Sequence, residues 1–210
     1  MTHTVIPDDE LKVFESLKNV KVVFDVGARD DVDYLILKPG IELHAFEPNP
    51  LFFGELKSSV GKTKKVHLNN FGLGDIDGDF EYGGYGGESI GKQVEHPTET
   101  SVKIKRLDDY VKDHNIKKID FLKIDTEGYE AKVLAGGKET IKKCRYIQYE
   151  QGNHGSKDGF ERFLPEDEFT LYYIGYRNVL GVRVGEEMPW IPEEPKEGGT
   201  TGKGEANKLK

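Results

Sequence analysis

Short β-branched runs alternate with helix-like segments along most of the chain, and this alternation limits the folds that it can adopt. A run at 21–26 (KVVFDV) precedes a segment at 31–38 whose apolar residues recur at helical spacing, and a second run follows at 42–47 (ELHAFE). Strands that are joined through a helix pair in parallel by right-handed crossovers. The chain is therefore predicted to be an α/β protein with a mostly parallel sheet.

The same alternation continues to residue 150. A short helix is predicted around Leu11, Phe14 and Leu17, ahead of the first strand. We therefore expect a doubly wound sheet with helices on both faces. The later predicted elements are helix 51–60, strand 65–69, helix 107–114, strand 119–124, helix 130–143 with an interruption at Gly136-Gly137, and strand 146–150.

Three further segments complete the predicted organisation. Runs at 169–174 and 179–184 indicate a C-terminal antiparallel hairpin at one edge of the sheet. The segment 72–91 contains eight glycines, which predicts a hairpin or a mobile flap rather than a helix. The polar stretch 193–210 has the composition of a disordered tail, which leaves 1–192 as a single domain.

Charge and cysteine content narrow the possible functions. The formal net charge of −8 argues against nucleic acid as the main partner, because such binding needs clustered Lys and Arg. The sequence has no signal-peptide pattern and no run of about 18 apolar residues, so we expect a protein that is neither secreted nor membrane-spanning. Cys144 is the single cysteine, which excludes an internal disulfide and favours a reducing, cytoplasmic location.

The loop after the first predicted strand has the features of a nucleoside site. Asp25 and Gly27 end this strand, and Glu47 follows the second strand 22 positions after Asp25. A glycine turn lets a ligand approach the backbone, and an acid about 20 residues later can accept hydrogen bonds from ribose hydroxyls. Gly27 is the single glycine of its loop, so the G-x-G-x-x-G pattern of NAD enzymes is absent and an oxidoreductase is disfavoured.

Acidic residues follow the strand at 119–124. Asp125, Glu127 and Glu130 are expected at the same edge of the sheet as the glycine turn, where a carboxylate can act as a general base. Lys123 shares a strand face with Asp125, so an ion pair is expected between them. An alternative is structural: Asp125 caps the next helix, and the two glutamates decorate its first turn. Glu150 ends the following strand and is also expected at this edge.

Several histidines and tyrosines have both a structural and a functional interpretation. His154 lies in a loop beyond Glu150, where it could accept a proton or serve only as a loop residue. Tyr82, Tyr85 and Tyr129 could stack on a sugar ring or a base, although packing is the commoner role of tyrosine. His44 and His67 lie within strands and are expected to be packed, structural residues. No spacing of His, Asp and Glu matches a metal motif, so no required metal is predicted.

Five runs, in order, resemble the FkbM family of S-adenosylmethionine-dependent methyltransferases. They are FDVGARDD, HAFEPNP, IKRLDDY, IDFLKIDTEGYEAKVLAGG and IQYEQG, and together they span about residues 22–152. The resemblance implies a Rossmann-like, seven-stranded class I methyltransferase fold, with S-adenosylmethionine at the first βα turn. It also implies methyl transfer to a hydroxyl of a sugar, a glycan or a related small molecule.

The resemblance also assigns residues to the site. Asp25 and Gly27 would lie at the methionine side of the cofactor, Glu47 would bind the ribose, and 71–75 would lie near adenine. The catalytic residues implied or favoured at the acceptor side are Lys123, Asp125, Glu127, Glu150 and His154. The full set of expected cofactor-binding residues is Asp25, Gly27, Ala28, Arg29, Glu47, Pro48, Asn49, Gly72, Leu73 and Asp125.

Two functions remain open at this point. One is an O-methyltransferase in which Asp125, assisted by Glu127 or His154, takes the proton of the acceptor hydroxyl. The other is a non-catalytic ligand-binding or carbohydrate-binding module that has lost the cofactor. This alternative arises because Asp31 replaces the second glycine of the G-A-N-x-G pattern that is usual in the family. The sequence identifies neither the acceptor nor the oligomeric state.

Overall fold

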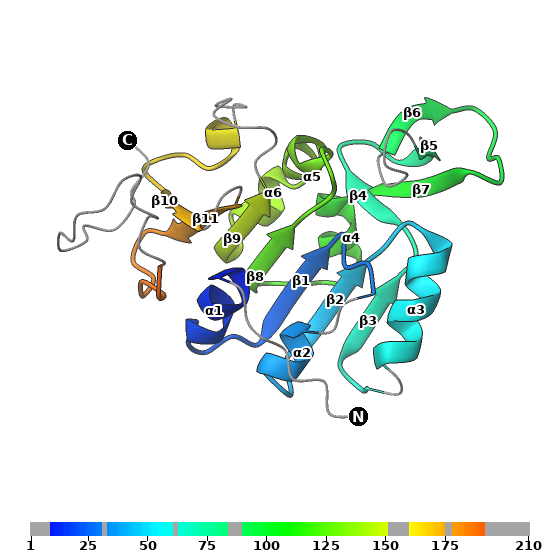
Figure 1. Ribbon diagram of the computed structural model, residues 1–210. Helices are drawn as coiled ribbons and strands as arrows, with labels where there is room; N and C mark the ends of the chain where they lie inside the picture. Colours follow the sequence, from blue (N-terminus) through cyan, green and yellow to red (C-terminus); the bar gives the residue numbers. More distant parts are fainter. Residues whose placement is uncertain are drawn as a thin grey trace, which may run out of the picture.

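A computed structural model describes residues 9–30, 33–60, 63–83, 90–150, 160–174 and 178–191. Within these ranges, seven strands form one sheet in the order β10-β11-β9-β8-β1-β2-β3 (Figure 1). Its strands are β1 (Val22–Val26), β2 (Glu42–Phe46), β3 (Val66–Asn69), β8 (Ile119–Ile124), β9 (Cys144–Glu150), β10 (Phe169–Ile174) and β11 (Asn178–Arg183).

The strand directions confirm the predicted doubly wound sheet. Strands β3, β2, β1, β8 and β9 pair in parallel. Strand β11 runs antiparallel to both β9 and β10, so the predicted C-terminal hairpin is also confirmed. Central strand β8 is buried along almost its whole length, and four of its six residues are apolar.

Helices cover both faces of this sheet. One face packs against α1 (Asp9–Ser16), α2 (Asp33–Leu37) and α3 (Pro50–Val60), through core residues such as Phe14 and Leu56. The other face packs against α4 (Leu107–Asp113) and α5 (Glu130–Gly136), through residues such as Tyr110. The short helix α6 (Lys138–Ile141) follows α5, and the 3-10 helix η1 (Phe160–Phe163) precedes β10. No helix in the described ranges is both long enough and apolar enough to cross a bilayer.

A second, smaller sheet was not predicted as such. Among the described residues its strand order is β4-β7-β5-β6. The hairpin expected within 72–91 is confirmed as the β5–β6 pair, while 84–89 lie outside the described residues. Strand β7 was not predicted, because only two of its six residues are buried and the other four are polar. The bounds are β4 (Gly72–Gly74), β5 (Gly78–Tyr82), β6 (Ile90–Val94) and β7 (Ser101–Arg106).

Gly136 allows the second sheet to pack closely against helix α5. A Cβ on Gly136 of helix α5 would lie 1.7 Å from the carbonyl oxygen of Gly74 in β4. No side chain fits into this contact, so β4 and α5 pack backbone to backbone. The predicted interruption of the helix at 130–143 is confirmed, because α5 ends at Gly136 and α6 starts at Lys138. The tail predicted at 193–210 lies outside the described residues.

Candidate functional site

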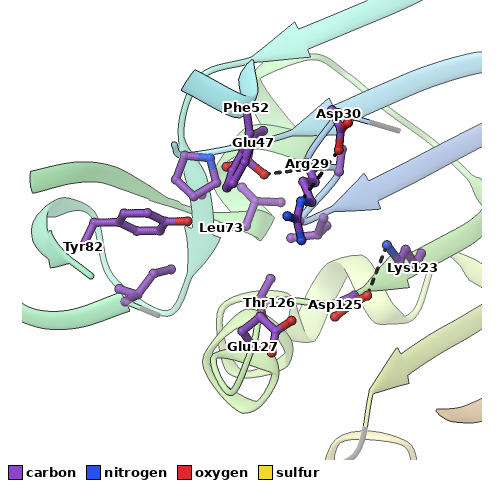
Figure 2. Close-up of a pocket in the computed structure, with 16 residues that line it drawn as sticks. Arg29, Asp30, Glu47, Phe52, Leu73, Tyr82, Lys123, Asp125, Thr126 and Glu127 are labelled. Atoms are coloured by element: carbon purple, nitrogen blue, oxygen red, sulfur yellow. Dashed lines mark hydrogen bonds and ion pairs between the residues drawn. The ribbon is translucent and has the colours of Figure 1, made fainter. Parts of the chain in front are cut away.

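A cavity of about 250 Å³ lies beyond the carboxyl ends of β1, β2 and β8 (Figure 2). Strand β1 stands between β2 and β8, so the sheet grows outward in both directions from this point. Ligands bind at this position in doubly wound sheets. The cavity is lined by Val26, Gly27, Ala28, Arg29, Asp30, Glu47, Pro48, Phe52, Gly72, Leu73, Tyr82, Ile90, Lys123, Asp125, Thr126 and Glu127.

Gly27 joins the loops after β1 and β8. Its φ angle is +84°, and a Cβ at this position would lie 1.7 Å from the backbone oxygen of Asp125. The amides of Gly27 and Ala28 both donate to the carbonyl oxygen of Phe46, at 3.0 and 3.1 Å. A glycine is therefore required here for the contact between the two loops, a role that the sequence reasoning did not foresee.

Glu47 is buried at the end of β2, with 4% of its surface exposed. Its Oε2 accepts a hydrogen bond from the Arg29 amide at 2.9 Å, and its Oε1 accepts one from the Asn49 amide at 2.7 Å. The three residues predicted for cofactor binding are thus brought together, although Asn49 supports Glu47 and does not itself line the cavity. Glu47 therefore lies at the edge of the cavity with its carboxylate held by the backbone of both neighbouring loops.

Lys123 joins two carboxylates at the base of the cavity. Its Nζ lies 3.5 Å from Asp25 Oδ1 and 3.5 Å from Asp125 Oδ2, so the ion pair predicted with Asp125 is present. The contact with Asp25 was not predicted. Burial acts to lower the pKa of Lys123, but the nearby carboxylates, Asp25 first, hold that pKa well above its ordinary value. Asp25 itself is buried and does not line the cavity, so any contribution it makes to ligand binding is indirect.

The structure gathers three of the predicted catalytic acids. Carboxylate oxygens of Asp125, Glu127 and Glu150 all lie within 4.8 Å of one another. Oxygen ligands in such a set can hold a divalent cation such as Mg²⁺. The alternative in which Asp125 caps the next helix is wrong, because the N-cap of α5 is Tyr129 and no side chain caps it. His154, predicted beside this group, lies outside the described residues.

Glu130 is a buried structural residue, which corrects the interpretation that it decorates the surface of α5. Only 2% of it is exposed, and its Oε1 accepts hydrogen bonds from the amides of Thr126 and Gly128, at 2.8 and 3.0 Å. The Thr126 hydroxyl donates to the same oxygen at 3.0 Å. Glu130 therefore holds the loop that presents Asp125 and Glu127 to the cavity.

The opposite wall combines predicted and unpredicted residues. Tyr82 lines the cavity from β5, as one of the tyrosines that could stack on a ligand. Tyr129 instead packs against Phe80, with ring centroids 6.2 Å apart, and Tyr85 lies outside the described residues. The sequence reasoning missed Val26, Asp30, Phe52, Ile90 and Thr126. All except Ile90 lie within or next to the motifs at 25–31, 42–50 and 119–130, which was the available signal.

Arg29 and Phe52 form the rim of the cavity between these walls. The Arg29 guanidinium carbon lies 4.7 Å from the Phe52 ring centroid, in a cation–π arrangement. Figure 2 shows the Arg29 side chain extending between Glu47 and the Thr126–Glu127 loop. The cavity persists beside it, so Arg29 lines the space between the β2 and β8 ends without filling it.

Comparison with known proteins places these residues in a family. Residues 25–177 match the family described as "Methyltransferase FkbM domain". The 2-O-methyltransferase NoeI of Sinorhizobium fredii is 27% identical over 186 residues, covering 76% of this chain and 75% of that protein. The hexuronic acid methyltransferase AglP of Haloferax volcanii is 26% identical over 140 residues, covering 64% of this chain and 57% of that protein.

Solved structures share the fold. The METTL16 methyltransferase domain superposes with a TM-score of 0.50 at 14% identity, covering 85% of this chain and 70% of that chain. At this identity the likeness concerns the fold alone. The family match is more specific, because its residues span most of the chain and include every residue that lines the cavity. The protein therefore belongs to the FkbM methyltransferase domain family.

Proposed function

We propose that this protein is an S-adenosylmethionine-dependent O-methyltransferase that acts on a hydroxyl of a sugar, a glycan or a related small molecule. One observation carries the proposal: the Gly27 loop, the buried Glu47 and the group of Asp125, Glu127 and Glu150 meet around the cavity at the carboxyl edge of the sheet. This arrangement provides a nucleoside-binding side and a proton-accepting side within one site.

The residues around the cavity fit this cofactor. Glu47 places a carboxylate, an acceptor suited to ribose hydroxyls, at the cavity wall after β2. Phe52, Leu73 and Ile90 offer apolar surface of the kind that a flat base requires. The cofactor carries a sulfonium and an ammonium group, and the acidic side chains along the cavity are suited to both positive charges. When bound, the cofactor would supply a methyl group attached to a sulfonium sulfur, which is a good leaving group.

The acidic group is suited to accept a proton from the acceptor. The Asp125 side chain is 39% exposed, so one of its carboxylate oxygens can meet a substrate hydroxyl while Lys123 holds the carboxylate in place. Glu127 and Glu150 lie close enough to share or relay that proton. Most of the acceleration would come from alignment of the hydroxyl with the methyl group, which is an effect of binding geometry.

Two further observations support a sugar or glycan acceptor. Tyr82 presents an aromatic side chain at the cavity wall, and such rings commonly pack against the faces of sugars. The relatives named above comprise a 2-O-methyltransferase and a hexuronic acid methyltransferase.

We also propose that the protein is cytoplasmic, and that residues 1–192 form one domain. The single cysteine of the chain, Cys144, supports a reducing location.

Titration with S-adenosylhomocysteine, followed by methyl transfer, tests the proposal. S-adenosylhomocysteine, the form of the cofactor left after methyl transfer, should bind with one site per chain, whereas NAD should not bind. Cofactor labelled in its methyl group, incubated with a panel of neutral and uronic-acid glycans, should then label at least one acceptor. Analogue binding without transfer to any sugar hydroxyl would contradict the acceptor class. Absence of binding would favour the non-catalytic module, which the Asp31 substitution suggests.

A further inference from the structure

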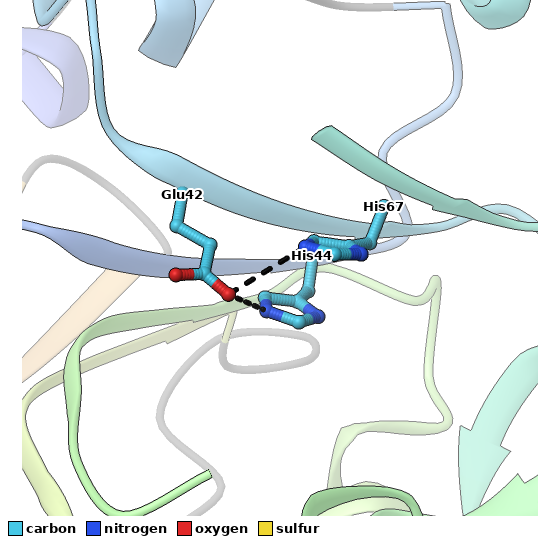
Figure 3. Close-up of side chains that lie close together, drawn as sticks. All are labelled: Glu42, His44 and His67. Atoms are coloured by element: carbon cyan, nitrogen blue, oxygen red, sulfur yellow. Dashed lines mark hydrogen bonds and ion pairs between the residues drawn. The ribbon is translucent and has the colours of Figure 1, made fainter. Parts of the chain in front are cut away.

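A second cluster of ligating side chains lies at the other end of β2 from the cavity. Glu42 starts β2, His44 stands two residues later on the same face, and His67 is the direct partner of His44 on β3. Figure 3 shows the Glu42 carboxylate turned towards both imidazole rings. Five residues of extended strand, about 16 Å, separate Glu42 from Glu47, so this cluster is distinct from the cavity.

The donor atoms have the spacing that a tetrahedral ion requires. Glu42 Oε1 lies 3.3 Å from His44 Nε2 and 3.5 Å from His67 Nε2. Two ligand atoms that are each about 2.1 Å from a tetrahedral zinc ion lie about 3.4 Å apart. One donor atom from each of the three residues lies within 4.8 Å of the others. The spacing of the donor atoms therefore matches such an ion, and the orientation of the rings is the remaining requirement.

His44 is also supported as a ligating histidine would be. It is 2% exposed, and its Nδ1 lies 2.8 Å from the hydroxyl of Tyr110, which accepts a hydrogen bond from the Asn69 side-chain amide. A metal-bound histidine usually donates its second ring N–H to such a partner.

We propose that Glu42, His44 and His67 form a binding site for a divalent transition-metal ion, with zinc the best match. Two imidazoles and one carboxylate select such ions over Mg²⁺ and Ca²⁺. Three protein ligands leave a fourth position for water, and the partly exposed Glu42 and His67 side chains leave this position accessible. The ion would fasten β3, the last strand of the described sheet, to β2.

Binding requires one rearrangement, which the strand order permits. The His44 and His67 rings are stacked with centroids 4.3 Å apart and an interplanar angle of 12°, so one ion cannot lie in the plane of both. The expectation that both histidines are packed is confirmed for His44 and wrong for His67, whose side chain is 46% exposed because β3 has no further neighbour among the described strands. His67 can therefore turn while His44 remains fixed.

Calorimetric titration of the full-length protein with zinc chloride, after removal of any affinity tag, tests the proposal. One zinc ion should bind per chain with a dissociation constant in the micromolar range, and Co²⁺ should give the intense absorption of a four-coordinate site. His67→Ala should weaken zinc binding about 10- to 100-fold and abolish that spectrum. At zinc concentrations of 100 times the dissociation constant, the melting temperature of the wild type should rise by about 5–10 °C.

Two control variants test whether zinc binds at another histidine or at the acidic group of the cavity instead. His96→Ala removes an exposed histidine outside the cluster, and Glu127→Gln changes the acidic group at the cavity. Both should bind zinc as the wild type does, whereas Glu42→Gln should bind it weakly. The proposal is overturned if zinc does not bind, or if His67→Ala retains wild-type affinity. Loss of binding in Glu127→Gln alone would also overturn it, because the ion would then lie in the cavity.

Discussion

The two ends of strands β1 and β8 carry different residues in the same unusual backbone conformation. Four non-glycine residues in the described ranges have positive φ angles. Asn19 (+57°) precedes β1 and Asn115 (+54°) precedes β8, whereas Arg29 (+52°) follows β1 and Glu127 (+53°) follows β8. Asparagine tolerates the left-handed region, but arginine and glutamate adopt it at a cost of about 1–2 kcal/mol.

The difference indicates that the residues with positive φ angles at the carboxyl end do not favour backbone stability. Arg29 and Glu127 both line the cavity, and a glycine or asparagine at either position would relieve the backbone. Strain that persists at such positions is typical of ligand sites. We infer that the side chains at the carboxyl end are retained for their chemistry, and that the asparagines at the amino end serve the turns alone.

The largest expected effect contrasts two aspartates of the β8 region. Asp125→Asn should lower turnover about 100-fold or more, because the proton acceptor is lost, while the affinity for S-adenosylhomocysteine changes by less than about threefold. Steady-state kinetics and calorimetry measure the two quantities. Unchanged turnover in this variant would remove Asp125 from the mechanism.

Asp120→Asn is the matched control at the amino end of β8. Asp120 accepts hydrogen bonds from the amides of Lys21 and Val22 and pairs with Arg145 at 3.2 Å. Its replacement should cost about 2 kcal/mol of unfolding free energy. Turnover of the folded protein at low temperature should not change. A large loss of turnover in Asp120→Asn would contradict the assignment of a structural role to the amino end of β8 and a catalytic role to its carboxyl end.

The next effect concerns Glu47. Glu47→Ala should weaken binding of S-adenosylhomocysteine about 10- to 100-fold, because it removes the hydrogen-bond acceptor proposed for the ribose. It also leaves the partly buried amides of Arg29 and Asn49 without their acceptor, so the unfolding free energy should fall by about 1 kcal/mol. Glu47→Gln keeps one carbonyl oxygen, so it should lose less affinity for S-adenosylhomocysteine and less unfolding free energy than Glu47→Ala. Equal affinity in all three proteins would exclude Glu47 from the cofactor site.

Sequence reasoning succeeded where a pattern is local and repeated. The runs around β1, β2, β8 and β9 were located to within about two residues, because each contains clustered β-branched, aromatic or other apolar residues and is bounded by polar or turn-forming residues. The convergence of Asp125, Glu127 and Glu150 also followed from the rule that parallel strands end at a common edge.

It failed where the deciding contact is between distant segments. The Asp25–Lys123 ion pair depends on β1 lying next to β8. The second sheet depends on β4, a strand of three residues that include two glycines and carry no periodic signal. Neither of these features is visible without the strand order.

A smaller effect tests the backbone strain directly. Glu127→Gly should leave stability unchanged or raise it by up to about 1 kcal/mol, while turnover falls about tenfold through loss of the carboxylate. Glu127→Gln retains the strained backbone and should lower turnover to a similar degree without any gain in stability. Asn115→Gly, at the amino end, should change both quantities little. Thermal melts and steady-state rates on the same preparations provide the comparison, and wild-type turnover in Glu127→Gly would show that its side chain is dispensable.

The smallest expected effect comes from removal of metal ions. Turnover should stay within about twofold after treatment with a chelator, and added Mg²⁺ should not raise it, because Lys123 already places a positive charge 3.5 Å from Asp125. Chelation should lower the melting temperature of zinc-loaded protein without changing its rate, since Glu42 and Glu47 stand at opposite ends of β2. Loss of turnover that Mg²⁺ restores, with a Mg²⁺ requirement altered by Glu150→Gln, would instead make the group of Asp125, Glu127 and Glu150 a metal site. The carboxyl end would then differ from the amino end by a bound cation as well as by its strained side chains.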